Sequence, residues 1–190
     1  MLIGRYSAFL DANVLHPAFL RAALLWFADD RLLRPVWSKH VLDEWRSSLK
    51  ARYPDLTDEK IDRLQLFVHQ FPDAEVTDYE PFIEGLDLPD LGDRHVVAAA
   101  KVAGCDGIVT RNLKDFPAAV VGPLNLEVVH PDDFIVNMID LDQDRGFEVV
   151  KRHRVAMTQT SPSPDQYLVK CERCGLIKTA ARLRNHKGAI

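Results

Sequence analysis

The chain has 190 residues, of which 47% are hydrophobic and 27% are charged, and its formal net charge is −4. This balance is that of a globular protein with one core domain and a small extension. No apolar run is long enough to span a bilayer, and Asp11 interrupts the stretch where a signal peptide would need an apolar centre. Three cysteines do not make a disulfide framework, so we expect a protein of the reducing cytoplasm.

The charge is unevenly distributed along the chain. Residues 151–190 contain nine Lys or Arg and two acids, a net charge of +7, whereas residues 1–150 contain 15 basic and 26 acidic residues, a net charge of −11. This division predicts an anionic partner for the basic segment, or docking of the segment on the acidic remainder. An ordinary charged helix surface is the alternative explanation.

Strands and helices are predicted to alternate in the first half of the chain. The predicted strands are short and apolar, and the predicted helices have apolar residues at helical spacing. Ser38 is suited to cap a helix, and Pro54 is suited to end it. In chain order we expect a strand at 6–11, a helix at 17–30, an extended segment at 34–38, helices at 38–53 and 57–71, and a strand at 74–79.

The alternation continues to about residue 141, which predicts an α/β fold with a mainly parallel central sheet flanked by helices. The strand predicted at 106–110 has no polar face, as expected in a parallel sheet covered on both sides. Three further helices predict a small helical extension, so we divide the chain into domains at 1–141 and 142–190. The remaining elements are a helix at 93–104 ended by Gly104, a loop or single turn at 111–117, a strand at 124–129, and helices at 131–141, 144–158, 164–176 and 178–186.

Four acidic residues fall near the predicted strand ends, where binding sites of open α/β sheets lie. Asp11 closes the first strand, Asp115 follows the strand at 106–110, and Asp93 opens the helix before that strand. Glu44 lies on the helix that follows residues 34–38. A carboxylate cluster without nearby His or Cys favours Mg²⁺ or Mn²⁺ over zinc.

Each acid also has a structural interpretation. Asp11 could begin a turn, and Asp115 could be a turn acid before Phe116 and Pro117. Asp90 and Asp93 could be the N-cap and first-turn acid of one helix. Glu44 could be an ordinary exposed helix residue. The residues alone leave both interpretations open.

Three segments, FLDANVL, VWSKHVLDEW and LGDRHVVAAAKVAGCDGIVTRNLKDFP, resemble in this order the PIN-domain ribonucleases, and among them the VapC-type toxins of toxin–antitoxin pairs. The resemblance covers about residues 6–141. The third segment contains two of the four acid motifs. Each motif is only a few residues around an acid, so the specificity comes from the order and separation of the four. The segment SPDQYLVKCERCGLIKTAARLR is similar to a helical C-terminal extension on one branch of these proteins.

The resemblance implies a Rossmann-like PIN fold and an endoribonuclease that uses Mg²⁺ or Mn²⁺ to hydrolyse RNA phosphodiester bonds. It also implies an RNA substrate, a cognate antitoxin and a homodimer. The implied catalytic residues are Asp11, Glu44, Asp93 and Asp115. Of these, Asp11, Asp93 and Asp115 would hold the metal, with Asp90 and Asn112 as accessory residues.

Two other functions stay open: a housekeeping PIN nuclease that acts on structured RNA or DNA, and a PIN-like binding module without chemistry. The complete acid set argues against the module. In the extension, the residues predicted to contact RNA or a protein partner are Arg152, Arg154, Arg182 and Arg184.

Cys171 and Cys174 have the spacing of zinc ligands, with His186 and His153 as candidate further ligands. A zinc knuckle usually places such a pair on a tight turn and adds a second matched pair. We therefore expect two helix residues near a packing face. His95 is interpreted as a helix residue or substrate contact and not as a catalytic base.

Overall fold

The computed structural model describes residues 5–190 and divides them into two compact units that interleave along the chain. The sheet unit contains residues 6–16 and 34–129, and the helical unit contains Arg5 and residues 17–33 and 130–190. The compact units do not follow the domain division predicted between residues 141 and 142. That division stays a prediction. Among the described residues, no helix combines the length and apolar character needed to cross a membrane.

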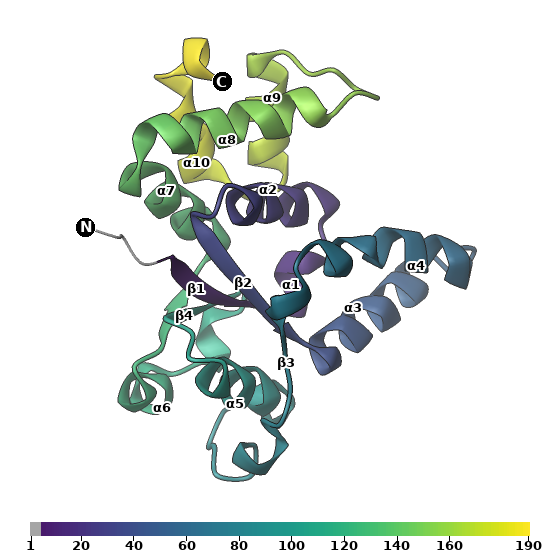
Figure 1. Ribbon diagram of the computed structural model, residues 1–190, viewed down its shortest axis with the longest axis vertical. Coiled ribbons are helices and arrows are strands. Elements are labelled where there is room, and N and C mark those ends of the chain that lie inside the picture. The colour runs from purple at the N-terminus through teal and green to yellow at the C-terminus, as the bar shows by residue number, and fades with distance from the viewer. Residues whose placement is uncertain (1–4) are drawn as a thin grey trace. The chain divides into compact units, whose positions relative to one another are not determined.

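The sheet has five parallel strands in the order β3-β2-β1-β4-β5, which confirms the predicted α/β fold (Figure 1). Phe9 of β1 lies opposite Ile108 of β4, and Ile108 lies opposite Val128 of β5. Because all strands run in one direction, their carboxyl ends share one edge of the sheet. The strands are β1 (Tyr6–Leu10), β2 (Leu33–Ser38), β3 (Glu75–Val76), β4 (Gly107–Val109) and β5 (Glu127–Val129).

The helices of the sheet unit follow the predicted signals at several ends. The Ser38 hydroxyl accepts a hydrogen bond from the Val41 amide at 3.3 Å, which caps α3. Gly104 ends α5 with a φ of +63°, a conformation that glycine adopts without a steric penalty. The helices are α1 (Ala12–Leu15), α3 (Lys39–Arg52), α4 (Asp58–Gln65), α5 (Arg94–Val102) and α6 (Ala118–Val121).

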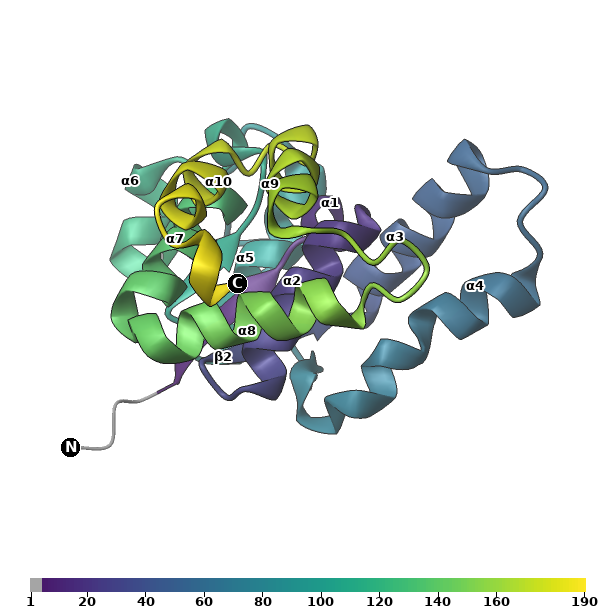
Figure 2. The ribbon, with the colours of Figure 1, turned by 90° about the horizontal axis from the view of Figure 1, so that it is seen from above.

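In the sheet unit, packing joins α5 to β1 and β4, and ion pairs join α3 to α4. The α5 helix is buried over most of its length, from His95 to Ala100, and contacts both strands. The predicted helix at 57–71 is instead α4 followed by a 3-10 helix at Leu66–Gln70. The α3–α4 hairpin seen in Figure 2 is joined by Arg46, whose guanidinium pairs with Asp58 at 2.7 Å and with Asp62 at 2.5 Å.

The helical unit packs five helices, and the helices predicted in this part of the chain are confirmed. Gly146 allows close approach within it, because a Cβ there would lie 2.7 Å from the Cα of Ile139. The core of the unit includes Phe27, Phe134 and Leu183, all at most 1% exposed. The helices are α2 (Ala18–Asp29), α7 (Pro131–Leu141), α8 (Gln143–Ala156), α9 (Pro164–Arg173) and α10 (Ile177–Arg184).

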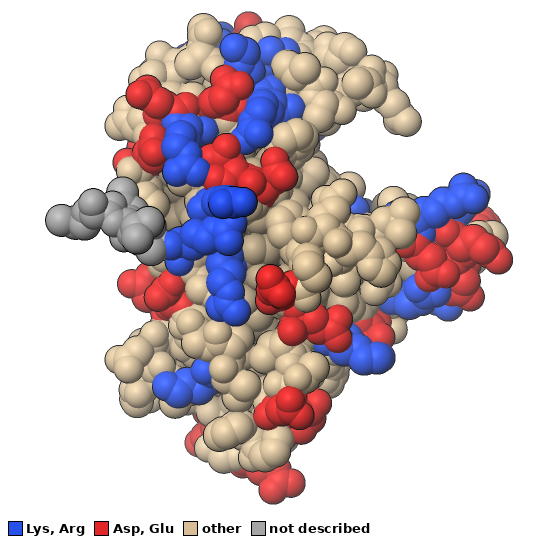
Figure 3. Space-filling view, in the orientation of Figure 1, with Lys and Arg blue, Asp and Glu red and all other residues tan. Residues whose placement is uncertain are grey.

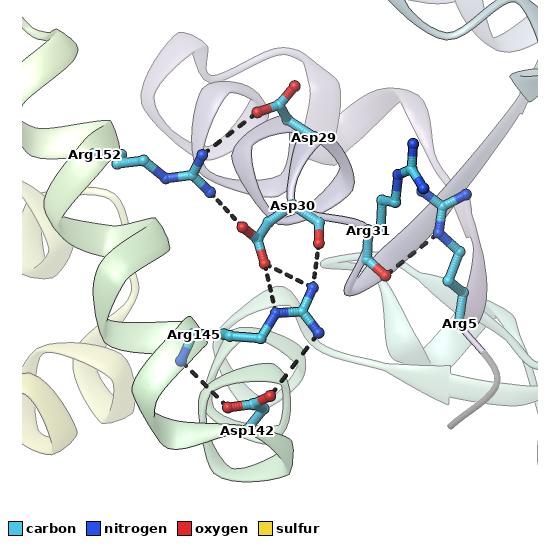
Figure 4. A network of polar contacts seen from close by, with 7 residues as sticks. All are labelled: Arg5, Asp29, Asp30, Arg31, Asp142, Arg145 and Arg152. Carbon is cyan, nitrogen blue, oxygen red and sulfur yellow. Dashed lines mark hydrogen bonds and ion pairs between the residues drawn. The ribbon is translucent and has the colours of Figure 1, made fainter. Parts of the chain in front are cut away.

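Two carboxylates of the helical unit join segments that are distant in the sequence. Asp30, just after α2, accepts from Arg145 Nε at 3.0 Å and Arg152 at 2.6 Å, both on α8 (Figure 4). Asp132 on α7 is 4% exposed and accepts three hydrogen bonds of 2.8 Å, from the amides of Lys178 and Thr179 and from the Thr179 hydroxyl. Asp132 therefore binds the first turn of α10.

Candidate functional site

Asp11 lies at the carboxyl end of β1 and is 6% exposed. Its carboxylate accepts hydrogen bonds from the Thr110 hydroxyl at 2.7 Å and from the Asn13 side-chain amide. Asn13 also donates to the Thr110 oxygen at 2.8 Å and accepts from the Arg111 amide at 3.0 Å. These bonds hold the carboxylate at the edge where β1 and β4 end.

Three further aspartates converge in the sheet unit. One carboxylate oxygen each of Asp90, Asp93 and Asp115 lies within 4.8 Å of the other two. Asp90 caps the 3-10 helix Leu91–Asp93 by accepting from the Gly92 amide at 2.8 Å. Asp115 accepts from the side-chain amide of Asn112. The structure therefore brings together two predicted metal ligands and both predicted accessory residues.

Asp93 has a different environment from a capping acid. Although it stands at the N-cap position of α5, its side chain makes no capping hydrogen bond. Its Oδ2 atom is buried and has no hydrogen-bond partner among the described residues. Burial, followed by the charges of Asp11, Asp90 and Asp115, raises the pKa of Asp93 to about 6. A carboxylate in this position needs either a proton or a cation.

The donor set fits a hard divalent cation. It consists of carboxylate oxygens from separate segments, and oxygen ligands of this kind suit Mg²⁺ and Mn²⁺. After burial, the charge of Asp11 is the largest contribution to the raised pKa of Asp93, so the Asp11 carboxylate acts on that of Asp93. Burial also raises the pKa of Asp11, and the hydrogen bond from Thr110 opposes that rise.

Glu44, the remaining predicted carboxylate, has histidine neighbours. Its Oε1 atom lies 3.2 Å from Nε2 of His95 and 3.8 Å from Nε2 of His40. Its charge contributes to the raised pKa of Asp11, so Glu44 acts on Asp11 although its oxygen is grouped with the two histidines.

Asn13 and Thr110 were not predicted as site residues. Asn13 stands two residues after Asp11, and Thr110 stands at the end of a predicted strand. Because the site was expected at the strand ends, the sequence could have indicated both residues. His40 and His95 are 55 positions apart in the sequence and come together only through the packing of α3 and α5 residues. Asp87, which precedes the cluster, is exposed.

The four arginines singled out in the extension all have partners within the helical unit. Figure 3 shows Lys and Arg interspersed with Asp and Glu over the C-terminal helices on the face drawn. Arg152 pairs with Asp30, and Arg154 donates to the Pro162 carbonyl at 2.8 Å. Arg182 pairs with Asp140 at 2.8 Å, and Arg184 pairs with Glu172. Their predicted contact with RNA or a partner stays a prediction.

The Cys171–Cys174 pair belongs to α9 and its C-cap. Cys171 is 1% exposed, and burial raises the pKa of its thiol to about 12. Since the thiolate is the zinc-binding form, this environment disfavours Cys171 as a ligand. The position agrees with the predicted packing role.

Comparison with known families matches two parts of the chain. Residues 7–114, more than half of the chain, match a PIN domain. The chain belongs to the PIN-domain family. Residues 131–185 of this PIN-domain protein match the VapC50 C-terminal domain, which confirms the predicted resemblance to VapC-type proteins with a helical extension.

A curated relative of this PIN-domain protein comes from Mycobacterium tuberculosis (strain ATCC 25618 / H37Rv) and is described as the candidate ribonuclease VapC50. It is 44% identical over 58 residues, which cover 30% of this chain and 34% of the relative. The match thus spans about a third of the relative's length. No solved structure gives a significant match.

Proposed function

We propose that this PIN-domain protein is an endoribonuclease that depends on Mg²⁺ or Mn²⁺ and hydrolyses RNA phosphodiester bonds. The proposal is carried by the convergence of carboxylate oxygens of Asp90, Asp93 and Asp115 within 4.8 Å of one another, where Asp93 also has a buried oxygen without a hydrogen-bond partner. The family supports a nuclease, and the description of the relative as a candidate ribonuclease supports RNA as the substrate.

In the proposed site, Asp11, Asp93 and Asp115 hold the metal, and Asp90 is an accessory acid. When bound, a divalent cation would activate water and neutralise charge on the phosphoryl group. Thr110 and Asn13 fix the Asp11 carboxylate, and Asn112 fixes that of Asp115.

Glu44 is the remaining catalytic carboxylate of the proposal. Its side chain is 41% exposed, so it can accept a hydrogen bond from the attacking water. His95, which is 3% exposed, contacts Glu44 Oε1 at 3.2 Å and restrains the carboxylate. Glu44 thus combines access to water with a fixed position.

We also propose that the protein is the toxin of a toxin–antitoxin pair, in the cytoplasm, with a cognate antitoxin and a homodimeric state. The match of residues 131–185 to the VapC50 C-terminal domain supports this setting. If the protein is a toxin, its expression should arrest growth. Co-expression of the product of an adjacent small gene should relieve the arrest.

Cleavage of RNA by the purified full chain should require a divalent cation. We expect hydrolysis with Mg²⁺ or Mn²⁺ and none with EDTA, because the aspartates repel one another and the substrate when no cation is bound. Denaturing gels of a labelled single-stranded RNA measure the cleavage, and restoring Mg²⁺ to the EDTA sample is the control. Undiminished cutting in EDTA would contradict the metal site.

The double variant Arg182→Gln/Arg184→Gln tests RNA contact by the extension. If both arginines contact phosphates, the salt dependence of RNA binding should flatten by one to two phosphate equivalents, or about 0.7 to 1.4 in log–log slope. The matched control, Arg52→Gln/Arg63→Gln on α3 and α4, removes the same charge and should leave the slope unchanged. An unchanged slope with lower thermal stability would assign Arg182 and Arg184 to packing.

A further inference from the structure

A second group of metal-ligating side chains lies in the sheet unit, and its chemistry differs from that of the aspartates. It consists of His40 and Glu44 on α3 and His95 on α5, each offering one ligand atom within 4.8 Å of the others. His40 and Glu44 are four residues apart on one helix, so they lie on the same face. His95 comes from another helix and is 3% exposed.

The ligand atoms have separations suited to a small cation. Glu44 Oε1 is 3.2 Å from His95 Nε2 and 3.8 Å from His40 Nε2. Neighbouring ligands of a tetrahedral zinc ion with bonds of about 2.0–2.1 Å are about 3.3 Å apart. The two imidazole rings are stacked, with centroids 3.8 Å apart and planes 11° apart, so His40 must tilt for both nitrogens to point at one ion. The side chain of His40 is 52% exposed, which allows that adjustment.

Ligand type separates this group from the aspartate cluster. Two imidazoles and one carboxylate favour borderline transition-metal cations, whereas an all-oxygen set favours Mg²⁺ or Mn²⁺. Three protein ligands also leave a fourth position open to water, as in other tetrahedral sites that are not closed.

We propose that His40, Glu44 and His95 form a separate site for a borderline divalent cation such as Zn²⁺, and that its occupation slows RNA cleavage. The inhibitory part rests on the proposed function, because Glu44 belongs to the catalytic set. A Glu44 carboxylate engaged by zinc is no longer available to the attacking water. Inhibition by zinc is thus expected at Mg²⁺ concentrations that saturate the aspartates.

Zinc binding is measured directly, on the full chain without an affinity tag, by competition with a chromogenic zinc chelator in excess Mg²⁺. We expect one zinc equivalent for the wild type and at least tenfold weaker binding for His40→Ala, which removes an exposed ligand at little risk to the fold. Three controls should bind zinc as the wild type does. They are His69→Ala at an exposed histidine elsewhere in the sheet unit, Cys174→Ser in the extension, and Asp93→Asn in the aspartate cluster.

RNA cleavage in Mg²⁺ gives the second measurement. Zinc should inhibit the wild type, whereas His40→Ala should keep the basal rate and resist zinc. Unchanged zinc affinity in His40→Ala, or loss of zinc in Asp93→Asn or Cys174→Ser, would overturn the site. Zinc bound through His40 without inhibition would overturn the regulatory part. Zinc binding is measured without RNA, so it tests the zinc site even if the protein does not cut RNA. Absence of RNA cleavage would refute only the proposed function.

Discussion

Replacing Asp93 with Asn is expected to lower metal-dependent RNA cleavage by about 100-fold or more while raising the thermal stability of the metal-free protein near neutral pH. The amide keeps the size of the side chain but removes a charge needed to hold a cation. The carboxylate it replaces has a buried oxygen without a partner and three acidic neighbours that raise its pKa. Removing that charge relieves repulsion, so function and stability should change in opposite directions.

The effect of Asp93→Asn on stability should depend on pH. The pKa of Asp93 is raised from 3.8 to about 6 in the folded protein, so between these values the folded state binds more protons than the unfolded state. Protonated Asp93 therefore stabilises the folded protein. This contribution to the free energy of unfolding is complete below pH 3.8 and is lost as the pH rises through 6. Unfolding temperatures in EDTA at about pH 5 and pH 7.5 measure it, and the variant should gain more over the wild type at the higher pH.

The matched control is Asp87→Asn, an exposed acid of the same segment. It should alter neither RNA cleavage nor the unfolding temperature. Melting of Asp93→Asn well below the wild type would instead favour a structural role for Asp93 at the start of α5. Full cleavage activity in that variant would exclude Asp93 as a metal ligand.

Replacing Asp132 with Ala should produce the largest loss of stability among the changes considered, about 2–4 kcal/mol in the free energy of unfolding. The carboxylate is 4% exposed and accepts three hydrogen bonds of 2.8 Å from Lys178 and Thr179. Without it, the amides of Lys178 and Thr179 lose their side-chain acceptor, and the Thr179 hydroxyl keeps only the backbone carbonyl of Asp132 at 3.3 Å. Urea unfolding followed by circular dichroism measures the difference.

Asp133→Ala is the neighbouring control for Asp132→Ala. The Asp133 carboxylate pairs with Lys178 Nζ at 2.5 Å, but both side chains are solvent-exposed, at 44% and 65%. An exposed ion pair of this kind contributes about 0–1 kcal/mol. Equal losses from the two variants would show that the buried hydrogen bonds of Asp132 do not stabilise α10 as the structure indicates.

Local sequence signals were sufficient for most elements of the fold. Ser38 predicted the start of α3 because its hydroxyl caps the helix, and Gly104 predicted the end of α5 because it adopts a positive φ. The apolar strands at 6–11 and 106–110 were also predictable, since a strand covered on both sides needs few polar residues. The short helices α1 and α6 were missed, because four residues carry too little periodicity to be recognised.

The site was only partly predictable for a related reason. Asp93 and Asp115 were predicted from their places beside strands, and the structure brings them within 4.8 Å of one another together with Asp90. The hydrogen bonds of Asn13 and Thr110 depend on the pairing of β1 with β4. No local sequence pattern indicates that pairing. The pairing of His95 with Glu44 likewise depends on tertiary packing.

The packing of α2 against later helices affects the folding of truncated fragments and folding during synthesis. Phe19 of α2 lies 5.1 Å from His153 of α8 and 5.3 Å from Tyr167 of α9, measured between ring centroids, and Arg152 of α8 lies over Trp26. A fragment ending near residue 141 would therefore expose the apolar face of α2, and we expect it to aggregate. On the ribosome, α2 emerges before α8 and α9. Its apolar face therefore stays uncovered until those helices have been synthesised. During that interval we expect chaperones to bind the uncovered apolar face of α2.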